Sequence, residues 1–132
     1  MSGSQHGQYR IHWQGELLVV KYIGAWNEVA VRNLHREARA LWQQHGGARW
    51  GMLSDLREWE GATPEALALW WQFFEDTVRH GLTAVTDILP SHFHEAMVKE
   101  LAERAGRLAT YCHHRELQPG LDWLSGQGLR TA

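Results

Sequence analysis

Cysteine, excess positive charge and long apolar runs are all scarce in this sequence. The single thiol, Cys112, cannot form an internal disulfide, and residues 1–10 lack the apolar stretch of a secretory signal, so we expect a cytoplasmic protein. Thirteen Lys and Arg against fifteen Asp and Glu give a formal net charge of -2, which argues against nucleic acid as a partner. The longest apolar run, 66–71, is far shorter than the roughly 20 residues of a transmembrane helix.

Aromatic and imidazole side chains are, by contrast, abundant, with eight Trp and nine His among 132 residues. The hydrophobic fraction of 44% and the charged fraction of 21% are typical of a globular protein, which excludes intrinsic disorder. The length suits one domain. We place this domain at residues 9–124, between a flexible N-terminal segment, 1–8, and a flexible C-terminal tail, 125–132.

The periodicity of apolar residues predicts how the chain is organised. A two-residue period over 9–13 indicates a half-buried strand, Gln14-Gly15 indicates a hairpin turn, and the apolar run 17–23 indicates an interior strand that pairs with the first. Later segments alternate between apolar runs and helical spacing, with capping residues at the helix starts. The further strands are expected at 50–56, 82–89 and 108–112. The helices are expected after Asn27, after Thr63-Pro64, from 90–91 to 105, and around 120–124.

This order of elements predicts the fold class. It is an α/β fold with a mixed five-stranded sheet, in which an N-terminal antiparallel hairpin is followed by parallel strands, flanked by about four helices. Right-handed crossovers are expected between the parallel strands.

The stretch that leads from the third expected strand into the second expected helix carries a recognisable pattern. It consists of Asp55-Leu56-Arg57, Trp59, Gly61, Thr63-Pro64 and Ala66-Leu67. This pattern resembles the DLRxFxGxTPxAL-like stretch of the SpoIIAA-like branch of the STAS/SEC14-type superfamily, and the element order is similar over roughly residues 9–124. The resemblance implies a STAS-like fold. It also implies a regulatory protein–protein interaction module similar to anti-sigma-factor antagonists.

Thr63 lies where the resemblance places a phosphorylated serine. True antagonists carry an Asp-Ser-Ser-Gly-like segment, whereas this chain has Gly61-Ala62-Thr63-Pro64, in which Thr63 alone offers a hydroxyl. A Thr at this position is also well suited to cap the following helix, because its side chain accepts a hydrogen bond from a backbone N–H. Thr63 is therefore a candidate phosphosite and a candidate helix cap.

The helix expected after Thr63 is apolar over a wide part of its circumference. Between 66 and 78 its apolar positions sweep roughly 200° of arc, more than a helix lying on a sheet requires. Either this helix is buried on two sides, or an exposed stripe serves a ligand, a membrane, a partner protein or a second subunit. Because open α/β sheets bind ligands at the carboxyl edge of the strands, we place a ligand site there. The candidate ligand-binding residues are Trp59, Trp70, Phe73 and Phe93.

Histidine and aspartate near the expected strand ends suggest a metal site, but their spacing does not favour one. His92 and His94 diverge on a helix, and the adjacent His113 and His114 point to opposite faces of a strand. The sequence from His94 begins as a zinc-protease HExxH motif, yet a valine takes the place of the second ligand. We therefore expect no metal and no cofactor.

The sequence favours binding over catalysis. Our interpretation is a non-enzymatic STAS-like binding module for a small lipophilic ligand, or for the apolar surface of a membrane or protein. The aromatic candidates would supply contact area, and movement of the helix that follows Thr63 would open the site. The alternatives are the regulatory interaction module and a metal-dependent enzyme that uses the strand-end His and Asp residues. A homodimer and peripheral membrane contact are compatible with the binding module.

Overall fold

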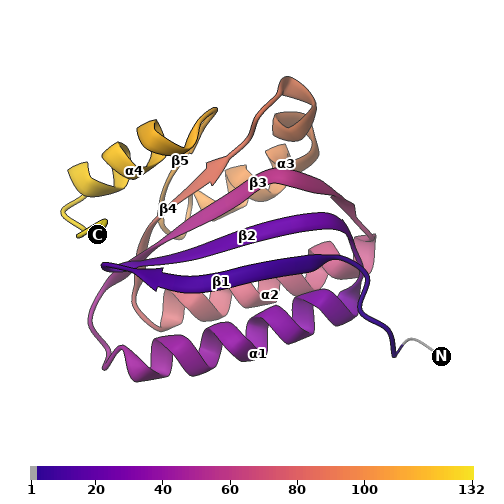
Figure 1. The fold of residues 1–132 in the computed structure, drawn as a ribbon, viewed down its shortest axis with the longest axis horizontal. Coiled ribbons are helices and arrows are strands. Elements are labelled where there is room, and N and C mark those ends of the chain that lie inside the picture. Colours follow the sequence, from indigo (N-terminus) through magenta and orange to yellow (C-terminus); the bar gives the residue numbers. More distant parts are fainter. Residues whose placement is uncertain (1–2) are drawn as a thin grey trace.

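Within residues 3–132, a five-stranded mixed sheet forms the centre of the protein and four helices flank it (Figure 1). The structure is a computed structural model, and it describes these residues. The strands are β1 (Gln8–Gln14), β2 (Leu17–Trp26), β3 (Trp50–Ala62), β4 (Leu82–Ile88) and β5 (Thr110–His114). The helices are α1 (Glu28–Gln44), α2 (Pro64–Arg79), α3 (His92–Ala105) and α4 (Leu117–Gly126). β1 and β2 are antiparallel, and β2 to β5 are parallel and adjacent in chain order, so the predicted fold class is confirmed.

The largest difference from the predicted boundaries is at β3. The apolar pattern predicts a strand that ends at 56, but β3 continues to Ala62 through a charged and largely exposed stretch. It continues because β2 runs alongside it as far as Trp26, with register shifts on the way. Pairing with a neighbouring strand, and not the alternation of its own side chains, therefore sets the end of β3.

Helices cover both faces of the sheet. α1, α2 and α3 pack on one face, over buried side chains such as Val20 and Met52. α4 packs on the other face, over Leu53 and Ile88. Successive residues of a strand point to opposite faces, which explains how Met52 and Leu53 belong to different clusters. Within residues 3–132, no helix combines the length and the apolar character needed to cross a membrane.

The segment after α4 packs against the hairpin between β1 and β2. The backbone N–H of Glu16 donates to the carbonyl of Arg130 at 2.8 Å, and Leu129 is buried with the side chains beneath α4. The packed unit therefore extends beyond residue 124. The flexibility of 1–8 and 125–132 concerns motion and stays a prediction, and residues 1 and 2 lie outside the described residues.

The wide apolar arc of α2 is used for packing on two sides within one chain. On the side of α1, the Phe73 ring lies 6.3 Å from the Trp42 ring, centroid to centroid. On the side of α3, the Arg104 guanidinium lies 4.0 Å above the Trp71 ring. In Figure 1, α1 and α2 lie side by side along the sheet. A helix between two others needs more apolar surface than one that lies on a sheet alone.

Candidate functional site

An apolar cavity of about 50 Å³ lies between the sheet, α2 and α3. α3 contributes Val98 and Ala102 to its wall, α2 contributes Trp70 and Phe74, and β3 contributes Trp59. One water molecule needs roughly 10–15 Å³ of cavity volume on the same measure. The cavity therefore has room for several waters or for part of a small ligand.

Four polar side chains, one from each of β2 to β5, line the sheet side of this cavity. They are Tyr22, Ser54, Asp87 and Tyr111, and we call them the polar row. All four occupy strand positions on the face that α2 and α3 cover, because alternate residues of a strand share a face. Ser54 and Asp87 are direct partners in the pairing of β3 with β4.

Hydrogen bonds hold both ends of the polar row but not its middle. At one end the indole Nε1 of Trp70 donates to the Tyr22 hydroxyl at 2.9 Å. At the other end the Tyr111 hydroxyl donates to Asp87 Oδ2 at 2.7 Å. Between them Ser54 is 1% exposed, and its Oγ has no hydrogen bond of good geometry among residues 3–132. Ser54 nonetheless lies near the Tyr22 hydroxyl, whose pKa it acts to lower. A buried hydroxyl without a partner is costly, so this atom marks a place where a bound group would be stabilised.

Burial dominates the electrostatics of the polar row. Burial raises the pKa of Asp87 to about 6, and the hydrogen bond from Tyr111 offsets only part of that effect. Burial also raises the pKa of both tyrosines, Tyr22 and Tyr111. The row therefore holds one carboxylate that ionises near neutral pH beside two phenols that stay protonated.

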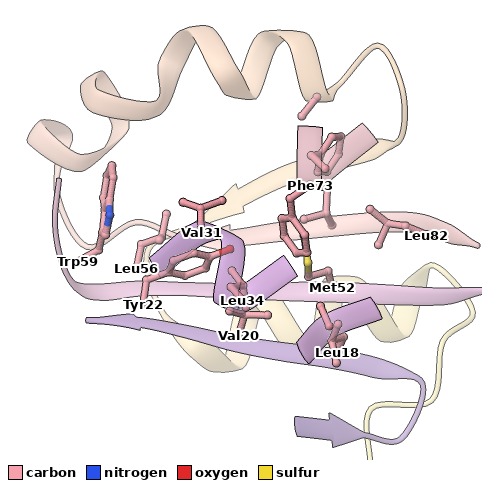
Figure 2. Packing of buried hydrophobic residues seen from close by; sticks show 14 of the residues in the cluster. Leu18, Val20, Tyr22, Val31, Leu34, Met52, Leu56, Trp59, Phe73 and Leu82 are labelled. Carbon is pink, nitrogen blue, oxygen red and sulfur yellow. The ribbon is translucent and has the colours of Figure 1, made fainter. Parts of the chain in front are cut away.

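The structure brings two of the four predicted ligand-binding residues to this cavity. Trp59 and Trp70 both line it. Phe73 is completely buried near the Trp42 ring and lines neither the cavity nor the groove described below. Figure 2 shows Trp59 at one end of the row of core side chains, with Tyr22 nearby, and Phe73 toward the other end.

The fourth predicted residue, Phe93, lies at an open groove outside the cavity. Its ring is 68% exposed at the start of α3. The groove has a volume of about 460 Å³, and Trp59 forms part of its wall as well as part of the cavity wall. The charged residues Arg57, Glu58 and Glu60 line it from β3. Trp59 thus lies between the apolar cavity and an open groove lined by charged residues.

Of the histidines considered as metal ligands, His92 and His113 both lie within 4 Å of Glu95 Oε1, whereas His94 and His114 each lie beside a hydroxyl. His94 Nδ1 lies 2.7 Å from Ser91 Oγ, and His114 Nδ1 lies 2.7 Å from Thr86 Oγ1. The side chain of His92 is almost fully exposed, and that of His113 is half exposed. In the described part of the chain, no three His, Cys, Asp or Glu side chains come together in a way that could hold a metal ion.

Comparisons with known proteins show which solved structures share this architecture. No family model matches the chain, and no curated protein matches it. Among solved structures, an uncharacterized protein from Shewanella loihica PV-4 with a SpoIIAA-like fold has a TM-score of 0.71 at 13% identity, over 94% of this chain and 98% of the other. The chain has a SpoIIAA-like fold.

Two further structures with this SpoIIAA-like arrangement are a cell fate determinant and an anti-sigma factor antagonist. Bacillus SpoIIAA in its phosphorylated form matches with a TM-score of 0.60 at 11% identity, over 89% of this chain and 99% of that one. An anti-sigma factor antagonist from Mycobacterium paratuberculosis matches with a TM-score of 0.60 at 15% identity, over 91% and 95%. At these identities the likeness concerns the fold, and the resemblance found in the sequence is confirmed at that level.

In this SpoIIAA-like fold, Thr63 lies at the exposed start of α2. Its Oγ1 accepts a hydrogen bond from the backbone N–H of Ala66 at 3.1 Å, which is the capping bond expected from the sequence. Its own N–H donates to the carbonyl of Trp26 at 3.0 Å, which fixes the start of α2 against the end of β2. Thr63 is therefore a helix cap, and its use as a phosphosite stays a prediction.

Sequence reasoning missed the polar row of this chain. Asp87 is one of the aspartates near the expected strand ends, but the sequence pattern does not connect it with Tyr22, Ser54 or Tyr111. The signal in the sequence is the alternation of strand residues between two faces, because Ser54 shares its face with the core residues Met52 and Leu56. A polar residue at such a buried position requires a hydrogen-bond partner, and neighbouring strands are where that partner is expected.

Proposed function

We propose that this protein is a non-enzymatic binding module whose cavity between the sheet, α2 and α3 takes a small, largely apolar ligand. The observation that carries this proposal is the cavity itself, in which apolar walls from α2 and α3 enclose the unpartnered Ser54 hydroxyl. A pocket with apolar walls and a few polar groups is the usual form of a small-molecule site.

Movement of α3 would give the ligand room. Only Val98 and Ala105 of this helix are buried, whereas α2 buries five residues, Phe73 among them. α3 is therefore held by less apolar packing than α2, and an outward shift of α3 requires less loss of buried surface. This assigns the opening motion to α3, and not to the helix that the sequence suggested.

Toluene tests the proposal, because its ring suits an apolar cavity and it carries no polar group. We expect saturable shifts in the amide NMR signals of residues that line the cavity, such as Trp59 and Ser54. Ala102→Phe, which fills the cavity from α3, should abolish these shifts, whereas Glu103→Phe on the exposed side of the same helix should preserve them. Shifts that persist in Ala102→Phe, or none in the unaltered protein, would contradict the proposal.

A second candidate, interaction with a partner protein, is favoured by the exposed Phe93 at the groove. Solved structures of the same fold include the anti-sigma factor antagonist SpoIIAA, which has been solved in an unphosphorylated and in a phosphorylated form. If a kinase regulates the interaction here, Thr63 would accept the phosphate. Thr63→Val would then lose phosphate incorporation from labelled ATP in a cell extract, and equal incorporation in both proteins would eliminate this candidate site.

A further inference from the structure

The polar row restricts what kind of polar group a ligand in the cavity can carry. Ser54 Oγ can donate one hydrogen bond and accept others, and it has no partner within residues 3–132. An ionised Asp87 can only accept hydrogen bonds, and Tyr111 already donates to one of its oxygens. The free capacity is therefore one donor and acceptor at Ser54, an acceptor at Asp87, and the O–H of Tyr22, whose oxygen accepts from Trp70.

A single hydroxyl group satisfies both residues. Ser54 and Asp87 are direct partners on neighbouring parallel strands, which lie roughly 5 Å apart, and both side chains face the cavity. A hydroxyl placed between them would donate its proton to the Asp87 carboxylate and accept the proton of Ser54. An ether or a ketone could not donate to Asp87, and a hydrocarbon would leave Ser54 without a partner.

A carboxylate ligand does not fit this arrangement. Among the described residues that line the cavity, none is Lys, Arg or His, so no cation is present to pair with an anionic ligand. The charge would lie close to that of Asp87 in an apolar environment, where unpaired charge is strongly disfavoured. The walls therefore select against the anionic head of a fatty acid as well as for a neutral hydroxyl.

We propose that the cavity selects small apolar alcohols and phenols, whose hydroxyl bridges Ser54 and Asp87, and that it excludes the corresponding carboxylates. This inference rests on the proposed function, because it names the class of ligand for the same cavity. It also gives the buried Ser54 hydroxyl a hydrogen bond of good geometry, which none of residues 3–132 provides.

Three probes with one ring skeleton test the proposal, namely toluene, p-cresol and 4-methylbenzoate. Each is titrated at pH 7.5 into the unaltered protein, Ser54→Ala and Asp87→Asn, with amide NMR shifts as the readout. We expect p-cresol to bind at least about tenfold more tightly than 4-methylbenzoate, since an unpaired buried charge costs more than a kcal/mol. Ser54→Ala should weaken p-cresol roughly three- to tenfold and leave toluene unchanged, because one hydrogen bond is lost.

Asp87→Asn serves as the matched test of charge. An asparagine keeps the shape of the side chain and can still accept from Tyr111, so discrimination against 4-methylbenzoate should shrink while toluene binds as before. If p-cresol binds no better than toluene, or if Ser54→Ala weakens both equally, the inference about the hydroxyl is overturned and the apolar cavity stands. If none of the three probes binds, the proposed function fails as well.

Discussion

Replacing Phe73 with alanine is expected to lower the free energy of unfolding by about 3–5 kcal/mol, the range for removing a large aromatic side chain from a packed core. The ring is completely buried, with Trp42 6.3 Å away and Trp70 also 6.3 Å away between ring centroids. Because α1 and α2 pack around this ring, the space left behind would not close without moving a helix.

Urea unfolding, followed by circular dichroism, measures this loss, and Phe93→Ala is the matched control. Phe93 is 68% exposed, so its removal should change stability by less than about 0.5 kcal/mol. Comparing the two variants also distinguishes two roles of phenylalanine in this sequence, because Phe73 packs in the core and Phe93 is available to a partner. Similar losses from both substitutions would contradict the structure.

The fold was predictable because local signals agree with each other along the chain. The caps at Asn27 and Thr63 are present, and each accepts a bond from the backbone three residues later. Where local signals ended, prediction failed, as at β3, which follows its partner strand past the end of its apolar run. Pairing between strands is a long-range property that periodicity does not record.

The candidate site was predictable in part, for a related reason. The carboxyl edge rule and an abundance of aromatic residues located Trp59 and Trp70 at the cavity. The same reasoning included Phe73, because a helical wheel does not distinguish the side of α2 that faces α1 from the side that faces α3. The polar row requires strand register to assemble, since its members come from four strands between residues 22 and 111.

Asp87→Asn is expected to stabilise the protein by about 3 kcal/mol at pH 7.5 and to have little effect at pH 4. The pKa of Asp87 is raised to about 6 by burial, from an ordinary value near 3.8, and each pKa unit corresponds to about 1.4 kcal/mol. Between these two values the folded state binds a proton that the unfolded state releases. Stability therefore falls as the pH rises from about 4 to about 6, and stays low above that range. Asparagine cannot ionise, so the variant should lack this decline.

Urea unfolding of both proteins at pH 4, 6 and 7.5 checks this dependence, with Asp122→Asn, which removes an exposed carboxylate on α4, as the control. Asp76 acts in the opposite sense: burial opposes its ionisation, but hydrogen bonds from His35 and Arg39 outweigh burial and lower its pKa. The stabilisation that Asp76 contributes is present above about pH 4 and lost below. It is the same in the unaltered protein and in Asp87→Asn, so it cancels in the difference between their stabilities. A stability difference that does not change with pH would contradict a buried, titrating Asp87. A difference that grows with pH would mean that the cavity keeps a destabilising carboxylate, as expected if that group serves a ligand.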